Sequence, residues 1–227
     1  MSIEKWDSAA QSYADAQQKS EFVRRNEEFV RERFSRVGGL QVLDMGCGYG
    51  SFTRYFDEMG AEVVGCDGSE KMLEIAKSGA ENVRFDIVDL TKPLPYENES
   101  FDLVFCNQVL MDIDDMEVAF AEAERVLKSG GTFWLSIVHP AFYDGEWLPG
   151  DGGKHAKAIS RYISLYSFEN NFWGATTHFH RPISYYLNAA AQQGFKLVRM
   201  DEPKIYNDDK NDDIPLFLYA EFIKDQH

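Results

Sequence analysis

Three glycines at alternate positions, Gly46, Gly48 and Gly50, follow a short apolar run in the stretch VLDMGCGYGSF. Glycines after a strand let the backbone approach a ligand closely and turn the N-terminus of the next helix toward it. The turn nearly matches the dinucleotide-binding fingerprint G-x-G-x-x-G/A, but Ser51 stands where the third small residue belongs. Asp67, about twenty residues further on, would accept hydrogen bonds from ribose hydroxyls of any such cofactor. These residues predict an adenosyl cofactor without deciding between NAD and another one.

The elements that must position this turn can be predicted from the hydrophobic pattern. Apolar runs without strict alternation are separated by segments with helical spacing, which is typical of parallel strands covered on both faces. The fold class predicted is therefore α/β, with a doubly wound sheet that binds its ligand at the carboxyl ends of the strands. We expect strands over 42–45, 62–66, 83–88, 101–106 and 132–138, helices over 51–59 and 69–78, and a helix opened by Asp114 and ended by Gly130 and Gly131.

Two segments stand outside this alternation. The first forty residues read as helix, with Ser20 as an N-cap and Gly38-Gly39 as the stop. Residues 139–181 break the pattern with two β-rich runs, which predict a β-hairpin joined at residues 169–171. A helix over 183–193 and strands over 195–200 and 216–223 then complete the chain. We expect one domain over 1–227, with residues 1–38 as a helical lid and residues 139–181 as a substrate cap.

Five motifs follow one another in a fixed order: VLDMGCGYG, VVGCDGS, FDIVDL and the run LPYENESFDLVFCNQVLMDIDD, followed by AEAERVLKSGGTFWLSIVHP. This ordered series resembles the class I S-adenosylmethionine-dependent methyltransferases, closest to the small-molecule branch that includes ubiquinone and menaquinone-type enzymes. The resemblance covers residues 6–138 and returns over residues 178–203. It implies a Rossmann-like, mostly parallel sheet of seven strands, with S-adenosyl-L-methionine as cofactor and S-adenosyl-L-homocysteine as its product.

The resemblance also assigns cofactor contacts, position by position. The turn after the first strand would surround the methionine portion, the acid after the second strand would hold the ribose diol, and the end of the third strand would meet the adenine. The main chain after the fourth strand would face the ammonium group, an N-terminal aromatic would close over the cofactor, and an arginine, Arg24 or Arg25, would pair with its carboxylate. The residues concerned are Tyr13, Arg25, Asp44, Gly46, Cys47, Gly48, Gly50, Asp67, Gly68, Met72, Asp89, Leu90 and Asn107.

Two departures from the family pattern bear on the acceptor. Many relatives carry a His shortly after the fourth strand, where this chain has Met111-Asp112. Asn107 is not followed by the Pro-Pro-aromatic run of amino-directed DNA methyltransferases, which counts against a nucleobase as acceptor.

Methyl transfer needs a general base only when the acceptor is a poorly ionised hydroxyl or a carbon acid. Candidate catalytic residues are Tyr13, His139, His178 and His180, with Tyr143 and Tyr166 as further candidate bases. His139 alternatively bonds to the backbone of its loop. His178 and His180 share one strand face, but a metal pair there lacks a third ligand, so no metal is expected.

The segment 139–181 is rich in aromatic residues, which either pack the hairpin onto the domain or form an apolar lid over the acceptor. Lys154, Lys157 and Arg161 either steer an anionic acceptor or are simply solvated.

Composition and charge narrow the possible partners and the cellular location of the protein. The net charge of −15 and pI near 4.7 argue against nucleic acid as a partner, since such proteins need a basic face. The N-terminus lacks the apolar core of a signal peptide, no run is long enough for a membrane span, and the three cysteines form no C-x-x-C pair. We expect a cytoplasmic small-molecule methyltransferase. Rivals are a protein or RNA methyltransferase, a non-catalytic cofactor-binding protein, and an NAD-dependent oxidoreductase.

Overall fold

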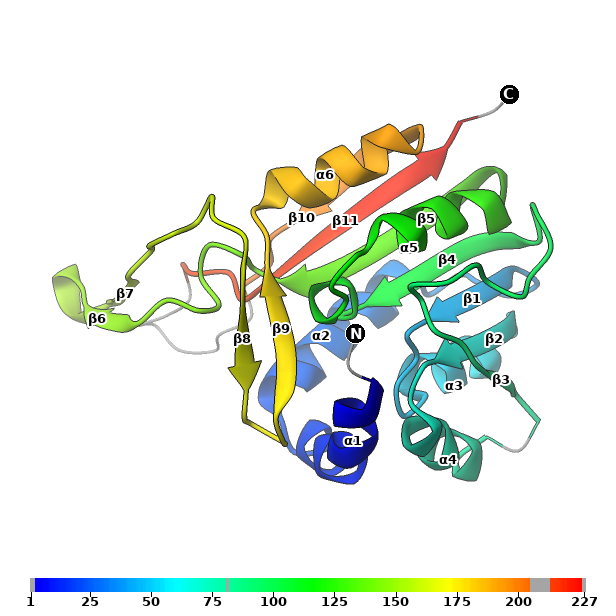
Figure 1. Cartoon of the computed structure of the whole chain (residues 1–227), viewed down its shortest axis with the longest axis horizontal. Helices are drawn as coiled ribbons and strands as arrows, with labels where there is room; N and C mark the ends of the chain where they lie inside the picture. Colours follow the sequence, from blue (N-terminus) through cyan, green and yellow to red (C-terminus); the bar gives the residue numbers. More distant parts are fainter. Residues whose placement is uncertain (1–2, 81, 205–212, 226–227) are drawn as a thin grey trace.

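A computed structural model of the chain describes residues 3–80, 82–204 and 213–225. Its centre is a seven-stranded sheet in the order β10-β11-β5-β4-β1-β2-β3 (Figure 1). Neighbours pair in parallel except around β11, which runs antiparallel to both β5 and β10. The predicted doubly wound, mostly parallel sheet is confirmed. Its strands are β1 (Gln41–Met45), β2 (Glu62–Asp67), β3 (Arg84–Ile87), β4 (Phe101–Asn107), β5 (Leu127–Val138), β10 (Phe195–Asp201) and β11 (Phe217–Lys224).

Helices cover both faces of this sheet. α2 (Glu21–Arg33) and α3 (Ser51–Glu58) pack on one face, where Phe105 and Trp134 stack in parallel at 4.7 Å between ring centroids. α5 (Glu117–Val126) and α6 (Ile183–Gln192) pack on the other face, against alternate residues of the same strands, such as Val104. Both faces of the central strands are therefore buried, which is why their sequences lack strict alternation.

The strand order reverses at β1, which lies between β2 and β4. The glycine turn follows β1 at this switch point, where doubly wound sheets bind ligands. The backbone N–H groups of Gly46 and Cys47 donate to the Cys66 carbonyl at 2.8 and 2.9 Å, which ties the turn to β2. Gly46 has a φ of +80°, and a Cβ there would collide with the Val109 side chain. The turn therefore requires glycine at this position for two independent reasons.

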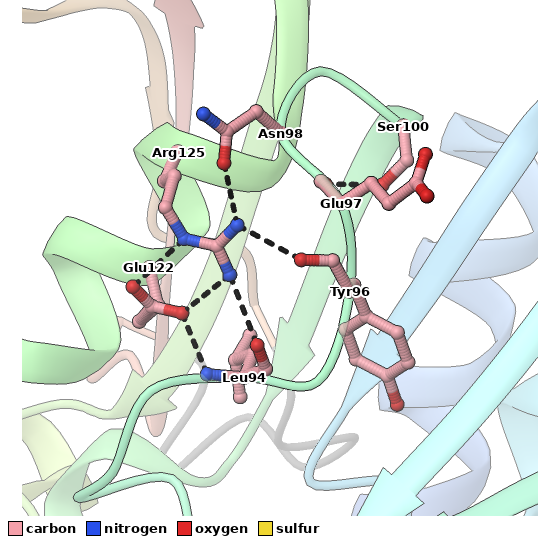
Figure 2. A network of polar contacts seen from close by, with 7 residues as sticks. All are labelled: Leu94, Tyr96, Glu97, Asn98, Ser100, Glu122 and Arg125. Carbon is pink, nitrogen blue, oxygen red and sulfur yellow. Dashed lines mark hydrogen bonds and ion pairs between the residues drawn. The ribbon is translucent and has the colours of Figure 1, made fainter.

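The loop that leads into β4 is held by one arginine (Figure 2). Arg125 of α5 donates to the carbonyls of Leu94 and Tyr96 and to Asn98 Oδ1, at 2.7 to 3.0 Å. Glu122, one helical turn earlier, accepts from Arg125 and from the Leu94 N–H at 2.6 Å each. A planar guanidinium satisfies several acceptors at once, so this network fixes how the loop enters β4.

Two predicted boundaries are wrong. Asp114 does not open α5, which begins at Glu117. Asp115, two residues before that start, accepts a hydrogen bond from the Glu117 N–H. Gly130 and Gly131 do not end it either, because β5 already begins at Leu127 and the glycines lie at a register shift against β4. Gly130, with a φ of +76°, belongs to a β-irregularity of the kind that favours glycine inside a strand.

The N-terminal region forms two helices, α1 (Ile3–Gln17) and α2, with Ser20 as the predicted N-cap of α2. The helix ends at Arg33 and not at Gly38, because Phe34 leaves it and packs edge-on against Phe56, Phe105 and Trp134. Between β2 and β3, Ser69 caps α4 (Glu70–Ser78) as predicted.

The segment after β5 forms two hairpins outside the main sheet. The predicted hairpin consists of β8 (Tyr166–Asn170) and β9 (Thr176–His180), so its turn falls after Asn170 and not at residues 169–171. A second hairpin, β6 (Trp147–Pro149) with β7 (His155–Lys157), was not predicted, and it extends away from the sheet in Figure 1. Among the described residues, no helix combines the length and apolar character that crossing a membrane requires.

Candidate cofactor and acceptor site

A cavity of about 620 Å³ lies at the carboxyl ends of the central strands. The glycine turn and the end of β4 form one side, and α1, α2 and the segment after β5 form the others. The volume falls within the range of ordinary small-molecule sites. Figure 1 shows α1 between the β8–β9 hairpin and α4, close to the strand ends.

The glycine-turn side of the cavity carries two buried acids. Asp67 accepts hydrogen bonds from the N–H groups of Gly48 and Ser69 at 2.9 and 2.8 Å. Burial raises the pKa of Asp67, although these N–H groups oppose the shift. Asp44 accepts from the Thr53 hydroxyl at 2.5 Å, and burial raises its pKa to about 7. Each Asp67 oxygen still has a lone pair for a further donor, such as the predicted ribose diol.

Gly48, whose N–H donates to Asp67, also lines the cavity. Its φ is +53°, and no heavy atom lies within 4 Å of the position that a Cβ would take. The open space on that side of the backbone fits a ligand that approaches the main chain directly.

The end of β4 forms another edge of the cavity. Asn107 lines the cavity, and its side-chain oxygen accepts from Asn26 Nδ2 and Ser136 Oγ at 3.2 and 2.7 Å. Its main chain is thereby fixed where the family resemblance places the ammonium group. Gln108 follows with a φ of +58°, an unusual conformation for a residue other than glycine. Ser136 holds it through both its carbonyl and its hydroxyl. Nothing in the sequence marks Gln108 as part of the site.

The predicted adenine end lies beside the cavity and not in it. Met72 lines the cavity, whereas Gly68, Asp89 and Leu90 do not. Asp89 accepts from the Thr91 N–H and hydroxyl at 2.9 and 2.7 Å, and Leu90 is buried. Their role in adenine recognition stays a prediction.

The pairing of an α2 arginine with the cofactor carboxylate stays a prediction. Arg24 and Arg25 pair with Glu28 on α2, and neither lines the cavity. The residues of α2 that do line it include Asn26 and Glu27. Glu27 accepts a hydrogen bond from Ser51 at 2.9 Å. An acidic group here would repel a cofactor carboxylate.

Tyr13 stands where three elements meet. Its ring makes edge contacts with Trp6 of α1, with Tyr49 of the glycine turn and with Trp173 of the hairpin turn, at 5.3, 6.1 and 5.0 Å between centroids. Burial raises its pKa, so its hydroxyl is neutral at physiological pH. The hydroxyl is therefore available as a hydrogen-bond donor and not as an anionic base.

Polar contacts fasten α1 to both sides of the cavity. Asp7 accepts from the Ser69 hydroxyl and the Lys71 N–H at 2.6 and 3.1 Å, at the N-terminus of α4 where an anion is favoured. Lys5 reaches Glu169 of the hairpin at 2.6 Å, and Ser12 donates to the Trp173 carbonyl. α1 thus bridges the cofactor side and the hairpin side.

Two of the three candidate histidines have structural partners. His139 is buried, with Nε2 at 2.6 Å from Glu202 Oε1 and Nδ1 accepting from the Ala141 N–H. His180 places Nε2 at 3.0 Å from the Tyr162 carbonyl. Neither lines the cavity, and their roles as candidate bases stay predictions.

His178 does line the cavity. It stacks on Tyr143 at 5.2 Å between centroids, and its Nδ1 lies 3.9 Å from Asp112 Oδ1. Burial lowers the pKa of His178 to about 3 and raises that of Asp112 well above its usual range. Tyr143 accepts from Asn170 Nδ2 at 2.9 Å, and burial raises its pKa to about 12. Tyr166 lies outside the cavity and donates to Asp144 at 2.9 Å.

The walls beyond this cluster are largely aromatic. Tyr143, Trp147, Phe172 and Trp173 line the cavity, while other aromatic residues of the segment pack within the hairpins. Lys157 also lines it, with Nζ 4.4 Å from the Trp147 ring centroid. Within the ranges the structure describes, no group of three or more His, Cys, Asp or Glu side chains is arranged to hold a metal ion.

Comparison with known proteins identifies related sequences and folds. The methyltransferase-domain family matches residues 43–135. The crystal structure of an S-adenosylmethionine-dependent methyltransferase from Mesorhizobium loti superposes with a TM-score of 0.78 and 27% sequence identity, over 91% of this chain and 99% of that one.

Two curated relatives match shorter stretches. A ubiquinone biosynthesis O-methyltransferase from Sinorhizobium medicae is 33% identical over 59% of this chain and 60% of its own length. A demethylmenaquinone methyltransferase from Leptospira interrogans is 38% identical over 46% of this chain and 44% of its own length. The matched region thus spans less than two thirds of each of these relatives.

Proposed function

We propose that this chain, which belongs to the class I S-adenosylmethionine-dependent methyltransferases, transfers a methyl group from that cofactor to a small-molecule acceptor. The observation that carries the proposal is one continuous cavity. Its glycine-turn side has the features the cofactor needs, and its other side has the aromatic walls of an acceptor pocket.

The charge of the cavity favours this cofactor over a dinucleotide. Four acids line it, Glu27, Asp44, Asp67 and Asp112, and Lys157 lies on the acceptor side. S-adenosylmethionine carries a sulfonium and an ammonium group, whereas NAD carries an anionic diphosphate. A cationic cofactor favours the ionised form of these buried acids and is attracted by it, whereas an anionic diphosphate is repelled.

The residues present also fit the cofactor in shape. The open backbone at Gly48 leaves room for it, Asp67 has acceptor capacity for the ribose, and the main chain at Asn107 is fixed by its side chain. When bound, S-adenosylmethionine would supply a methyl group on a sulfonium sulfur, from which an in-line nucleophile takes the methyl group and displaces the thioether. The protein's part is to align the acceptor with that methyl group and to exclude water.

A small molecule is favoured over a protein or an RNA as acceptor. α1 and the β8–β9 hairpin stand over the strand ends and contact each other, so they partly cover the cavity and narrow the access of a large acceptor. The strong negative charge also opposes binding to a phosphate backbone. The curated relatives are named for quinone substrates or quinone biosynthesis, and flat aromatic walls suit a planar acceptor.

We assign the lid role to residues 1–38 and the cap role to residues 139–181. The support is the set of contacts through Lys5, Asp7 and Ser12, which join α1 to α4 and to the hairpin. Closing both segments would dry the site and fix the approach of the acceptor.

Calorimetry on the full chain tests the proposal. We expect S-adenosylhomocysteine to bind and NADH not to bind. Methyl transfer from labelled S-adenosylmethionine to small aromatic acceptors should then be detectable, and should fall in a variant lacking residues 1–14 by much more than its melting temperature falls. Binding of NADH alone, or methylation of proteins or RNA only, would contradict the proposal.

A further inference from the structure

Asp112 and His178 face each other across the acceptor side of the cavity, although they lie far apart in the sequence. Asp112 belongs to the short 3-10 helix η1 (Leu110–Asp112) after β4, and His178 is the central residue of β9. Both line the cavity, with side chains only 14% and 8% exposed. Within the described part of the chain, neither side chain makes a hydrogen bond, and their closest approach is 3.9 Å. Two polar side chains that line a cavity and make no hydrogen bond to the described protein are open to a ligand bound there.

The surrounding structure holds this pair in place. The His178 ring lies between Tyr143 and Phe168, at 5.2 and 4.8 Å between centroids. Arg181, at the end of the same hairpin, is buried and donates to the carbonyls of Leu110, Ile113 and Asp114 on both sides of Asp112. The end of β9 therefore supplies one member of the pair and fixes the turn that carries the other.

We propose that Asp112 and His178 form the proton-accepting pair of this enzyme and that its acceptor is an aryl hydroxyl. The inference rests on the proposed methyltransferase function. At 3.9 Å the two side chains stand just beyond hydrogen-bond distance. We assign His178 Nδ1–H as the donor that closes on the Asp112 carboxylate when a ligand fills the cavity, which leaves Nε2 to accept the proton of the acceptor. A carboxylate that orients an imidazole and stabilises its protonated form is an established catalytic arrangement.

The proton and electron balance is simple. The hydroxyl proton passes to Nε2 of His178, and the acceptor oxygen forms a bond to the methyl carbon. The methyl–sulfur bond breaks with its electron pair left on sulfur, and the imidazolium later returns the proton to solvent. Burial lowers the pKa of His178 and raises that of Asp112, so without a ligand the ring is neutral and a weak base. A cationic cofactor beside Asp112 favours its ionised form, and that carboxylate in turn raises the pKa of His178 so that Nε2 can accept the proton. The other titratable or charged groups around His178 are Tyr143, His180 and Arg181.

The chemistry of the pair and the shape of the pocket select the acceptor class. A hydroxyl is poorly ionised at neutral pH and needs a base, whereas a neutral amine or an ionised thiol does not. The walls formed by Tyr143, Phe172 and Trp173 offer flat surfaces to an aromatic ring.

The first test needs no acceptor. ¹⁵N NMR of histidine-labelled protein bound to S-adenosylhomocysteine should show His178 protonated at Nδ1. Asp112→Asn should shift the two ring-nitrogen signals of His178 and leave those of His139 and His180 unchanged. Unchanged His178 signals in this variant would overturn the pairing.

The second test uses 2-naphthol and 2-naphthalenethiol, which differ in how readily they ionise. His178→Gln and Asp112→Asn should lower kcat for 2-naphthol by about 10²-fold or more, and kcat for the thiol by less than about 10-fold. Asp115→Asn, an exposed carboxylate in the same segment, serves as the matched control and should leave both rates unchanged.

Equal losses for the two probes would overturn the base assignment, and so would methylation of the thiol without any methylation of 2-naphthol. If the wild-type protein binds S-adenosylhomocysteine, either of these results overturns only the base assignment, and the proposed function stands. If the wild-type protein does not bind S-adenosylhomocysteine, the proposed function itself is refuted.

Discussion

Replacing Asp44 with Asn tests whether the cofactor site is built at a cost to stability. Asp44 is 2% exposed, and its carboxyl group accepts from the Thr53 hydroxyl at 2.5 Å. Burial raises its pKa from 3.8 to about 7. The fold therefore disfavours the ionised form. The stability linked to this group is fully present below its unfolded-state pKa and is lost as the pH rises through about 7.

The magnitude follows from the size of the shift. A rise from 3.8 to about 7 is about three pKa units, each worth about 1.4 kcal/mol, so full ionisation costs about 4 kcal/mol. Between about pH 5 and about pH 8, the linkage relation gives about 2 to 3 kcal/mol of that loss. Asn keeps the shape and an oxygen for the Thr53 hydroxyl but cannot ionise. We expect Asp44→Asn to gain about 2 to 3 kcal/mol over the wild type across this interval.

Urea unfolding of both proteins at each pH measures this gain, because the titration of all other groups cancels in the difference. Asp102→Asn is a control of opposite sign. Although burial opposes it, the Lys128 ammonium and the Gln41 N–H lower the pKa of Asp102. The stability that Asp102 contributes is lost only as the pH falls below its unfolded-state pKa, so the difference for this variant should stay constant over the interval. A constant difference for Asp44→Asn as well would refute the reasoning.

Three further substitutions test the site and the scaffold. Asp67→Ala removes the acceptor for the Gly48 and Ser69 N–H groups as well as the predicted ribose contact, so affinity for S-adenosylhomocysteine should fall by about 10²-fold, as calorimetry would show. Gly48→Val places a side chain in the cavity and should abolish that binding while the protein stays folded by circular dichroism. Arg125→Lys removes the planar guanidinium that donates to the Leu94 and Tyr96 carbonyls of the loop before β4. The free energy of unfolding in urea should fall by about 2 to 3 kcal/mol.

Each of these has an outcome that would count against it. Unchanged affinity in Asp67→Ala would remove Asp67 from the site. Gly39→Val is the matched control for Gly48→Val, because Gly39 has a φ of +79° and the same open surroundings outside the cavity. If both variants lose binding, backbone strain is the cause. Arg84→Lys, in an exposed pair with Asp86, should cost less than about 1 kcal/mol, and an equal cost for Arg125→Lys would contradict the role of the network.

The architecture could be predicted from the sequence because local signals determine it. Apolar runs on the central strands, the Ser20 and Ser69 caps and the glycine turn each indicate their element without knowledge of the rest of the chain. The exceptions arise where tertiary contacts override a local signal. Gly130 and Gly131 read as a helix stop but lie at a register shift within β5, which only the pairing with β4 reveals.

The cofactor side of the site could be predicted more fully than the acceptor side for a similar reason. Asp44, Gly48 and Asp67 come from strand ends and turns whose order along the chain is recognisable. Which residues of α2 line the cavity depends on the face that the helix turns inward, and Asp112 lies near His178 only because the hairpin folds back over η1. Such contacts join residues far apart in the chain, so no local sequence pattern indicates them.

The acids of the cavity link stability to function. Asp44, Asp67 and Asp112 each have a pKa raised chiefly by burial, and the charge of Asp67 raises the pKa values of the other two further. A fold selected for stability alone would not gather carboxyl groups in one desolvated cavity. A ligand with positive charge relieves this cost, because an opposite charge nearby favours the ionised form of each acid. The same groups that weaken the ligand-free protein therefore provide part of the affinity for a cationic cofactor, and this links the buried acids to the chemistry proposed for the site.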